Sequence, residues 1–286
     1  MNKLSIERQA QIIKVLCEGN SIRSTARITN SSINTVVKLL CEVGLACHRY
    51  QDKYVMNLTT TCIECDEIWS FCHAKEQNLT PDVKDKFGYG DVWTFVAIDA
   101  DSKLVVGWLV GERNPDYAYE FLKDVKRRLA NRVQLSTDGH RMYYQAVQGA
   151  FGDDIDFAVI AKAYGTPLNI EPGKYSPGTV RRVMRKAVHG NPDVKKVSTS
   201  YVERQNLTMR MNMRRFTRLT NGFSKKIQNH MFAIALHFMY YNFCKTHRTL
   251  ANPYPRTPAM ASGITDHIWK SEEIAQLLST SQGASS

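Results

Sequence analysis

Three carboxylates stand where an enzyme of phosphodiester chemistry needs metal ligands. Asp66 opens one predicted strand, Asp138 ends another, and Glu203 lies in the first turn of a basic helix. Two Mg²⁺ ions held about 3.5–4 Å apart by such oxygens can activate an attacking oxygen and stabilise the leaving one. We expect folding to gather the three at one end of a sheet, where Asp66 is shared by two Mg²⁺ ions and the other two acids hold one each. Mn²⁺ should be tolerated in their place.

Each acid also has an ordinary explanation. Asp66 could be a strand-end acid and Asp138 a turn residue, while Ser200 followed by Glu203 has the spacing of a helix capping box. Glu67 beside Asp66 should point to the opposite face of a strand, so it is the weaker ligand candidate. The joint placement on a first strand, a fourth strand and the following helix favours catalysis.

Basic residues surround Glu203 in the sequence. From residue 174 to residue 226 the chain has 14 Lys and Arg and two acids, so the local charge is 14 − 2 = +12, above the +11 of the whole chain. This large excess of basic over acidic residues predicts a polyanionic partner, and double-stranded DNA is the partner we expect. The residues of this half of the chain expected to contact DNA are Lys162, Arg181, Arg182, Arg185, Lys186, Arg204, Asn206, Arg210, Arg214, Lys225 and Lys226.

Residues 1–45 predict a small all-α domain of three short helices. A stripe of apolar residues at helical spacing comes first, Ser21 can cap a second helix, and Gly44 ends a third. Two short helices joined by a tight polar turn are typical of a helix-turn-helix, in which Asn34, Thr35 and Lys38 would face the major groove. The alternative is a three-helix interaction domain, and the excess of basic over acidic residues favours DNA.

The remainder of the chain predicts an α/β fold. Residues 46–61 are polar and are interpreted as a linker, and 62–245 predict three strands, a helix, a strand, a helix and a strand. That order is typical of a ribonuclease H-like mixed sheet flanked by helices. A basic insertion, 165–199, with a short helix near 180–188, should interrupt it. Residues 246–286 are interpreted as a C-terminal tail, and its polar part after Ser271 is expected to be loose.

The composition of the chain indicates its structural class and its cellular location. Hydrophobic residues make up 43% of it, which predicts a globular protein, and no apolar run is long enough to span a bilayer or to act as a signal peptide. We therefore expect a cytoplasmic, nucleoid-associated protein of a prokaryote. Cys62 and Cys65 have zinc-knuckle spacing, with Cys41 and Cys47 as candidate further ligands, but Cys65 sits inside a strand pattern. Buried thiols are therefore favoured over zinc.

Several segments together carry a resemblance to one enzyme family. They are 66–69, 137–139, 202–206, 218–225, 240–247 and 256–260. These resemble the DDE transposases of the insertion-sequence-one family over about residues 60–265. The resemblance implies a ribonuclease H-like catalytic domain with Asp66, Asp138 and Glu203 as its catalytic triad. It also implies Mg²⁺-dependent cleavage at element ends and transfer of the 3′-hydroxyl into target DNA.

The favoured hypothesis is therefore a transposase, a polynucleotidyl transferase that binds terminal inverted repeats and joins them to target DNA. Because two DNA ends must be brought together, a homodimer or a larger synaptic assembly is expected. Two alternatives stay open: a DNA-binding regulator derived from such an enzyme, and a nuclease that hydrolyses without strand transfer. The intact set of three acids argues against the regulator, whereas a nuclease would use the same metal site.

Overall fold

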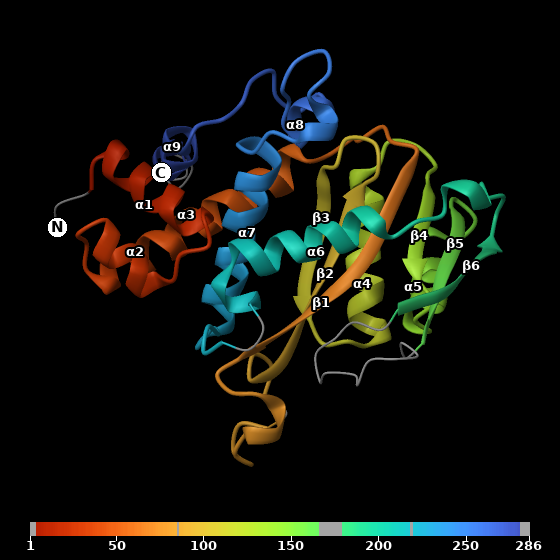
Figure 1. Ribbon diagram of the computed structural model, residues 1–286, viewed down its shortest axis with the longest axis horizontal. Helices are drawn as coiled ribbons and strands as arrows, with labels where there is room; N and C mark the ends of the chain where they lie inside the picture. Colours follow the sequence, from red (N-terminus) through yellow and green to blue (C-terminus); the bar gives the residue numbers. More distant parts are fainter. Residues whose placement is uncertain (1–3, 85, 166–178, 218–219, 281–286) are drawn as a thin grey trace.

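A six-stranded mixed sheet lies at the centre of the computed structural model, which describes residues 4–84, 86–165, 179–217 and 220–280 (Figure 1). The strands are β1 (Cys62–Cys72), β2 (Gly90–Asp99), β3 (Val105–Gly111), β4 (Gln134–Asp138), β5 (Asp156–Gly165) and β6 (Thr179–His189). Their spatial order is β3-β2-β1-β4-β5-β6. Strands β1, β4 and β5 are parallel, and the pairs β1–β2, β2–β3 and β5–β6 are antiparallel.

The predicted succession of elements up to β5 is confirmed. After three strands come α4 (Pro115–Arg128), β4, α5 (Met142–Phe151) and β5. Local signals specify these elements: Asp99 accepts the N–H groups of Asp101 and Ser102 in the β2–β3 turn, and Asn114 caps α4 through the N–H of Tyr117. The predicted mixed α/β architecture is therefore present in the described residues.

Helices cover both faces of the sheet. Helices α4 and α5 lie on one face, and α6 (Ser200–Asn212) crosses the other face over β1 and β2 (Figure 1). The next helix, α7 (Ile227–Phe243), packs against β3 and against the N-terminal helices. None of the helices in the described part of the chain is both long enough and apolar enough to cross a membrane.

The N-terminal helices are α1 (Ile6–Cys17), α2 (Ile22–Ile28) and α3 (Ile33–Tyr54). Three helices were predicted, but the prediction that the third ends at Gly44 is wrong, and 46–54 of the predicted linker is helical. Gly44 faces Phe232 of α7, and a Cβ at Gly44 would lie 2.5 Å from the Cβ of Phe232. The glycine therefore permits a close helix crossing and does not terminate the helix.

The first helices and the sheet share one hydrophobic core. Ile13 and Val43 are fully buried in the same core cluster as Ile68 of β1. The side-chain amide of Gln51 in α3 donates to the carbonyl of Ala235 in α7 (3.0 Å). The side chains of residues 1–45 therefore pack into the same core as the sheet.

Part of the predicted tail is helical, and the prediction that it is loose after Ser271 is wrong up to Thr280. Helix α8 (Pro258–Ala261) packs against α7, and α9 (Ser271–Thr280) packs against α1 and α3. Ile274 and Ala275 of α9 are buried, and the ring of Trp269 lies 5.0 Å from that of Tyr50 in α3. Because this segment is mostly polar, its short amphipathic helix was not predicted from the sequence. Residues 281–286 of the predicted tail lie outside the described residues.

The insertion also differs from its prediction. The segment near 180–188 is not a helix: it is strand β6, which pairs with β5 from Phe157↔His189 to Gly165↔Thr179. The unpaired edge of β5 offers a ladder of backbone partners that the sequence of the segment alone does not reveal. The part of the insertion at 166–178 lies outside the described residues.

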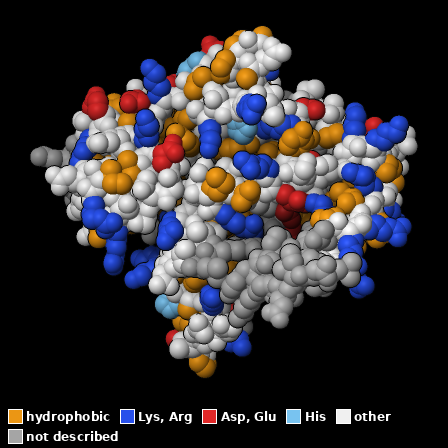
Figure 2. Space-filling view, in the orientation of Figure 1, with side chains coloured by type: hydrophobic (Ala, Val, Ile, Leu, Met, Phe, Trp, Pro, Cys, Tyr) orange, Lys and Arg blue, Asp and Glu red, His pale blue; other side chains and the backbone are white. Residues whose placement is uncertain are grey.

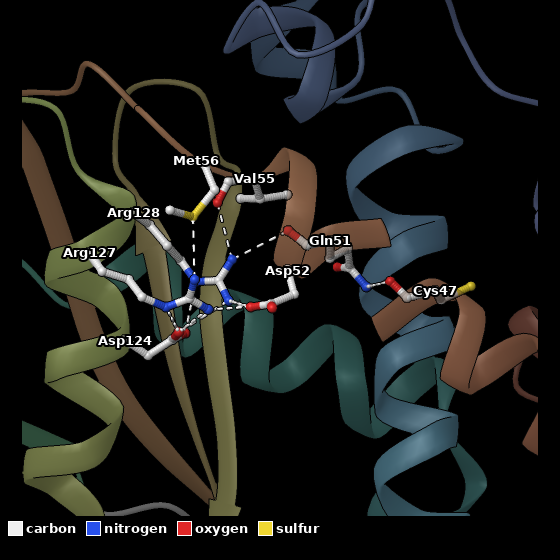
Figure 3. Close-up of polar contacts among 8 residues, drawn as sticks. All are labelled: Cys47, Gln51, Asp52, Val55, Met56, Asp124, Arg127 and Arg128. Atoms are coloured by element: carbon white, nitrogen blue, oxygen red, sulfur yellow. Dashed lines mark hydrogen bonds and ion pairs between the residues drawn. The ribbon is translucent and has the colours of Figure 1, made fainter. Parts of the chain in front are cut away.

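Two arginines at the end of α4 hold the C-terminal half of α3 (Figure 3). Arg128 is buried and donates to the carbonyls of Gln51 (3.3 Å) and Val55 (3.1 Å), which satisfies the end of α3. It also bonds Asp52 and Asp124 (2.8 Å each). Arg127 contacts the same two acids but is far more exposed.

Arg128→Met should lower the free energy of unfolding by about 2–4 kcal/mol, because buried carbonyls and a partly buried Asp124 lose their charged donor. Arg127→Met should cost less than about 1 kcal/mol, since exposed ion pairs contribute little. Urea unfolding of both variants measures the difference. Equal losses would mean that the hydrogen bonds of Arg128 to α3 contribute nothing specific.

Candidate active site

Glu64 fixes the start of α6 across the sheet. Its carboxylate is buried and accepts the backbone N–H groups of Tyr201 (2.7 Å) and Val202 (3.1 Å). Burial raises the pKa of Glu64, and the two N–H groups oppose that rise. A carboxylate at a helix N-terminus satisfies donors that have no partner within the helix. Glu64 was not anticipated from the sequence, although its position two residues before Asp66 places it on the same face of the strand.

Asp66 and Asp138 lie at the same level of neighbouring parallel strands. The β1–β4 register ends at Glu64↔Ser136, and two residues further along each strand stand Asp66 and Asp138. Neighbouring strands are about 4.8 Å apart, and residues in this register point to one face. At the end of β4, an oxygen of Asp138 accepts the backbone N–H of His140 (3.0 Å). Asp66 lies in the middle of β1, not at its start as predicted.

Helix α6 brings the third acid to the same face. The side-chain amide of Asn206 donates to Asp66 (2.8 Å), and Glu203 stands three residues earlier, about one helical turn away. Glu203 accepts the hydroxyl of Thr199 (2.6 Å) and forms an ion pair with Lys162 of β5. The helix cap is Thr199, so the capping box predicted at Ser200 as the alternative explanation does not form.

The acids influence one another electrostatically. Burial, followed by the charges of Glu67, Asp138 and Glu203, raises the pKa of Asp66 to about 7, and one backbone hydrogen bond opposes that rise. Carboxylates that raise each other's pKa stabilise a bound cation. The donor set of oxygens from Asp66, Asp138 and Glu203 therefore fits a hard ion such as Mg²⁺, which keeps water ligands and needs few protein ligands.

The three acids are not arranged as a finished metal site. Among the described residues, no three acidic, His or Cys side chains already stand together at metal-binding distance. Lys162 holds an oxygen of Glu203, and Asn206 holds an oxygen of Asp66. A metal would have to displace both donors. Cys62 and Cys65 are buried thiols in β1, as the sequence favoured.

Glu67 points to the opposite face of the sheet from Asp66, as predicted. Its carboxylate bonds the guanidinium of Arg113 (2.5 Å) and the hydroxyl of Tyr143 in α5 (2.9 Å). Burial, followed by the charge of Asp138, raises the pKa of Glu67, and Arg113 and Tyr143 lower it. Arg113 and Tyr143 were not anticipated from the sequence, because nothing local to either residue identifies a buried acid as its partner.

The predicted DNA contacts fall into separate groups. Arg204 is exposed beside Glu203, whereas Asn206 is buried against Asp66 and is therefore corrected from a surface contact to a member of the acid cluster. The basic side chains of β6 are exposed: Arg181, Arg182, Arg185 and Lys186. Arg214, Lys225 and Lys226 are exposed at the far end of α6 and before α7, and Arg210 is half-buried. Figure 2 shows basic side chains around an acidic patch at the middle of this face.

The three predicted base contacts lie on the first turns of α3. Asn34 and Lys38 are exposed, and Lys38 stands 3.8 Å from Glu42. Thr35 is half-buried, and its hydroxyl bonds that of the capping Ser32 (2.8 Å). The four residues between α2 and α3 make the tight turn that the helix-turn-helix prediction needs.

A buried polar network lies behind the acids and links α7 to β1. The imidazole of His230 bonds the hydroxyls of Ser70 (3.2 Å) and Ser224 (3.1 Å). His237 stands 3.4 Å from the amide of Gln205 in α6. Burial, with a nearby cation in each case, lowers the pKa of both histidines to about 3. Both imidazoles are therefore neutral in the folded protein.

Stability should fall as the pH drops below about 6.5, the ordinary pKa of histidine. Because each folded-state pKa is depressed, the unfolded chain binds protons first, and each histidine removes about 1.4 kcal/mol per pH unit until about pH 3. Urea unfolding at pH 7 and pH 5 measures this slope. His237→Gln should flatten it, and His189→Gln, which changes a half-buried residue of β6, should not. An unchanged slope in His237→Gln would contradict the assignment.

The chain is only weakly similar to known proteins. No protein-family model and no curated protein matches the chain. The Mos1 strand transfer complex matches at 15% identity and TM-score 0.22, over 52% of this chain and 56% of that one. The piggyBac transposase synaptic complex with hairpin DNA matches at 9% identity and TM-score 0.45, over 98% and 71%. The chain thus spans less than two thirds of the Mos1 chain, and likeness of this extent assigns neither its fold family nor its activity.

Proposed function

We propose that this protein is a DNA transposase that cleaves and joins DNA with a DDE site and Mg²⁺. The observation that carries the proposal is the register of β1 and β4, in which Asp66 and Asp138 each follow the last pair, Glu64↔Ser136, by two residues, with Glu203 one helical turn from the residue that bonds Asp66. Three acids from three separated elements on one face of a sheet suit divalent metal chemistry on phosphates. The resemblance to the insertion-sequence-one family adds the joining step.

The topology supports a ribonuclease H-like catalytic domain. The antiparallel strands β2 and β3 lie on one side of β1, and the parallel strands β4 and β5, followed by the antiparallel β6, lie on the other. Asp66 lies in the middle of β1, and Asp138 lies at the carboxyl end of the neighbouring β4. This edge of a parallel arrangement is where α/β proteins place ligands. Helix α6 then supplies the third acid from above the sheet.

The residues of the proposed site have different roles. Asp66, Asp138 and Glu203 would hold Mg²⁺ or Mn²⁺, which supplies activation of the attacking oxygen and charge stabilisation of the leaving one. Glu64 keeps α6 in place by binding its first N–H groups. Lys162, once released from Glu203, would donate to a phosphate oxygen.

Binding of the ends is assigned to separate surfaces. The exposed Asn34 and Lys38, with Thr35, would read terminal inverted repeats, and the basic groups near α6 and on β6 would hold the backbone of repeat and target DNA. Cleavage and joining at two ends require two active sites, so a homodimer or larger synaptic assembly is proposed. We propose a nucleoid-associated location in the cytoplasm of a prokaryote.

A pre-cut end assay tests the proposal. Duplexes that carry the DNA flanking the gene are incubated with the protein and a target plasmid, with and without Mg²⁺. Covalent joining of the 3′ end to the target supports a transposase. Hydrolysis alone would indicate a nuclease, and binding with neither reaction would indicate a regulator.

Arg181→Ala combined with Arg182→Ala should weaken binding to all DNA sequences alike, because both side chains are exposed on β6. Removing them should reduce the salt dependence of the affinity by about one to two phosphate contacts. Fluorescence anisotropy across a salt series measures the slope. The matched control, Lys53→Ala with Lys123→Ala, removes two exposed cations from α3 and α4. An unchanged slope in the first variant would remove β6 from the DNA path.

A further inference from the structure

A cavity of about 660 Å³ opens between the end of β4 and the first turns of α4 and α5. Its lining comes from two connections, β3 to α4 and β4 to α5, which bring Arg113, Pro115, His140, Arg141, Tyr144 and Gln145 to one place. Glycine and methionine at 139 and 142 complete the wall. We call this cavity the α4/α5 pocket.

The charge of the α4/α5 pocket selects an anion. Among the described residues that line it are two guanidinium groups and one imidazole, and no carboxylate. Arg113 is already oriented, because Glu67 holds one side of its guanidinium (2.5 Å) and the ring of Trp93 lies 4.5 Å beneath it. Arg141 is exposed at the mouth. An arginine fixed in this way binds a phosphate with little loss of side-chain entropy.

The rest of the lining suits a flat, apolar group. Tyr144 is half-buried and is supported from behind by the ring of Phe157 at 6.0 Å, and Pro115 adds an apolar surface. The exposed amide of Gln145 can donate and accept hydrogen bonds. Phosphate-binding cations beside an aromatic ring and an amide are the elements that recognise a single nucleotide.

The volume decides between paired and unpaired DNA. Sites for small organic ligands have volumes of about 300–1,000 Å³, so a nucleotide fits. A base that is stacked and paired in a duplex cannot enter such a pocket unless it leaves the helix. The α4/α5 pocket therefore suits an unpaired nucleotide.

Two residues that line the α4/α5 pocket directly follow Asp138 in the sequence. They are residues 139 and 140, and the N–H of His140 holds the carboxylate of Asp138 (3.0 Å). If a phosphate of a DNA strand lies at Asp138, the next nucleotides of that DNA strand would pass His140. We propose that the α4/α5 pocket binds an unpaired nucleotide of the DNA strand that reacts, so that substrates with unpaired ends are preferred over blunt ones. This inference rests on the proposed function.

Anisotropy in EDTA tests the inference without any cleavage. The probes are a blunt duplex of the flanking DNA, the same duplex with a three-nucleotide 3′ or 5′ overhang, and overhangs that lack bases. One overhang should bind about tenfold more tightly than the blunt end, and removing its bases should abolish the gain, because stacking of one base supplies such a factor. Tyr144→Leu and Arg141→Gln should each reduce the gain while blunt-end affinity changes less than about twofold. Lys186→Gln on β6 is the control and should weaken all probes equally.

Equal affinity of the wild-type protein for blunt and overhanging ends would overturn the inference. Equal losses on both probes in Arg141→Gln would also overturn it, since Arg141 would then be a general backbone contact. Thermal melting of Tyr144→Leu, expected within a few degrees of wild type, verifies that the variant folds. Failure of the proposed function is a separate result: overhang preference in EDTA would persist while Mg²⁺ produced neither cleavage nor joining.

Discussion

Asp138→Asn is expected to lower Mg²⁺-dependent DNA cleavage by at least about 1,000-fold, because an amide is a poor ligand for a hard cation and removes charge that the metal must balance. Affinity for DNA should change less than about twofold, since Asp138 is not one of the residues proposed to bind the DNA backbone. Gel assays of cleavage, alongside anisotropy of the same preparation, measure both quantities.

Asp154→Asn is the matched control. Asp154 is an exposed acid in the turn before β5, so its loss should leave the cleavage rate within about twofold of wild type. Cleavage at the wild-type rate in Asp138→Asn would exclude Asp138 from catalysis. It would also remove the neighbouring register of Asp66 and Asp138 as an argument for a metal site.

Glu64→Ala should lower both stability and catalysis. Two buried N–H groups at the start of α6 lose their acceptor, which should cost about 2–4 kcal/mol of unfolding free energy. Because α6 carries Glu203, cleavage should fall by more than about 100-fold, and the Mg²⁺ concentration for half-maximal activity should rise. Urea unfolding and a Mg²⁺ titration of cleavage measure these effects.

Glu64→Gln separates positioning from general stability. Both N–H groups donate to one oxygen of Glu64, so the amide oxygen of glutamine can still accept them without the negative charge, and stability and the Mg²⁺ requirement should recover in part. Glu120→Ala, a change at an exposed acid of α4, should leave both unchanged. A Glu64→Ala protein that loses stability but keeps the wild-type Mg²⁺ requirement would show that Glu64 does not position the acid on α6.

The sequence predicted those parts of the fold that local patterns specify. The strands from β1 to β5, the turn at Asp99 and the capped start of α4 at Asn114 depend on residues close in the chain, and all of these are present in the structure. The placement of Asp66 and Asp138 on neighbouring strands was expected as well, because each stood in a recognisable strand.

The features that the sequence did not predict share one physical cause: each depends on contacts between segments that are distant in the sequence. Gly44 looked like a helix end because its role depends on Phe232, far away in the sequence. Glu64 was overlooked because the strand was taken to start at Asp66, and its partners lie in α6. Strand β6 forms on the edge of β5, an edge that exists only after folding.

The packing of α9 against α1 and α3 ties the two extremities of the polypeptide together. A product that stopped before Ser271 would retain every acid discussed above, yet the apolar surface now covered by Ile274 and Ala275 would face water. Premature stop codons before Ser271 would therefore yield aggregation-prone protein.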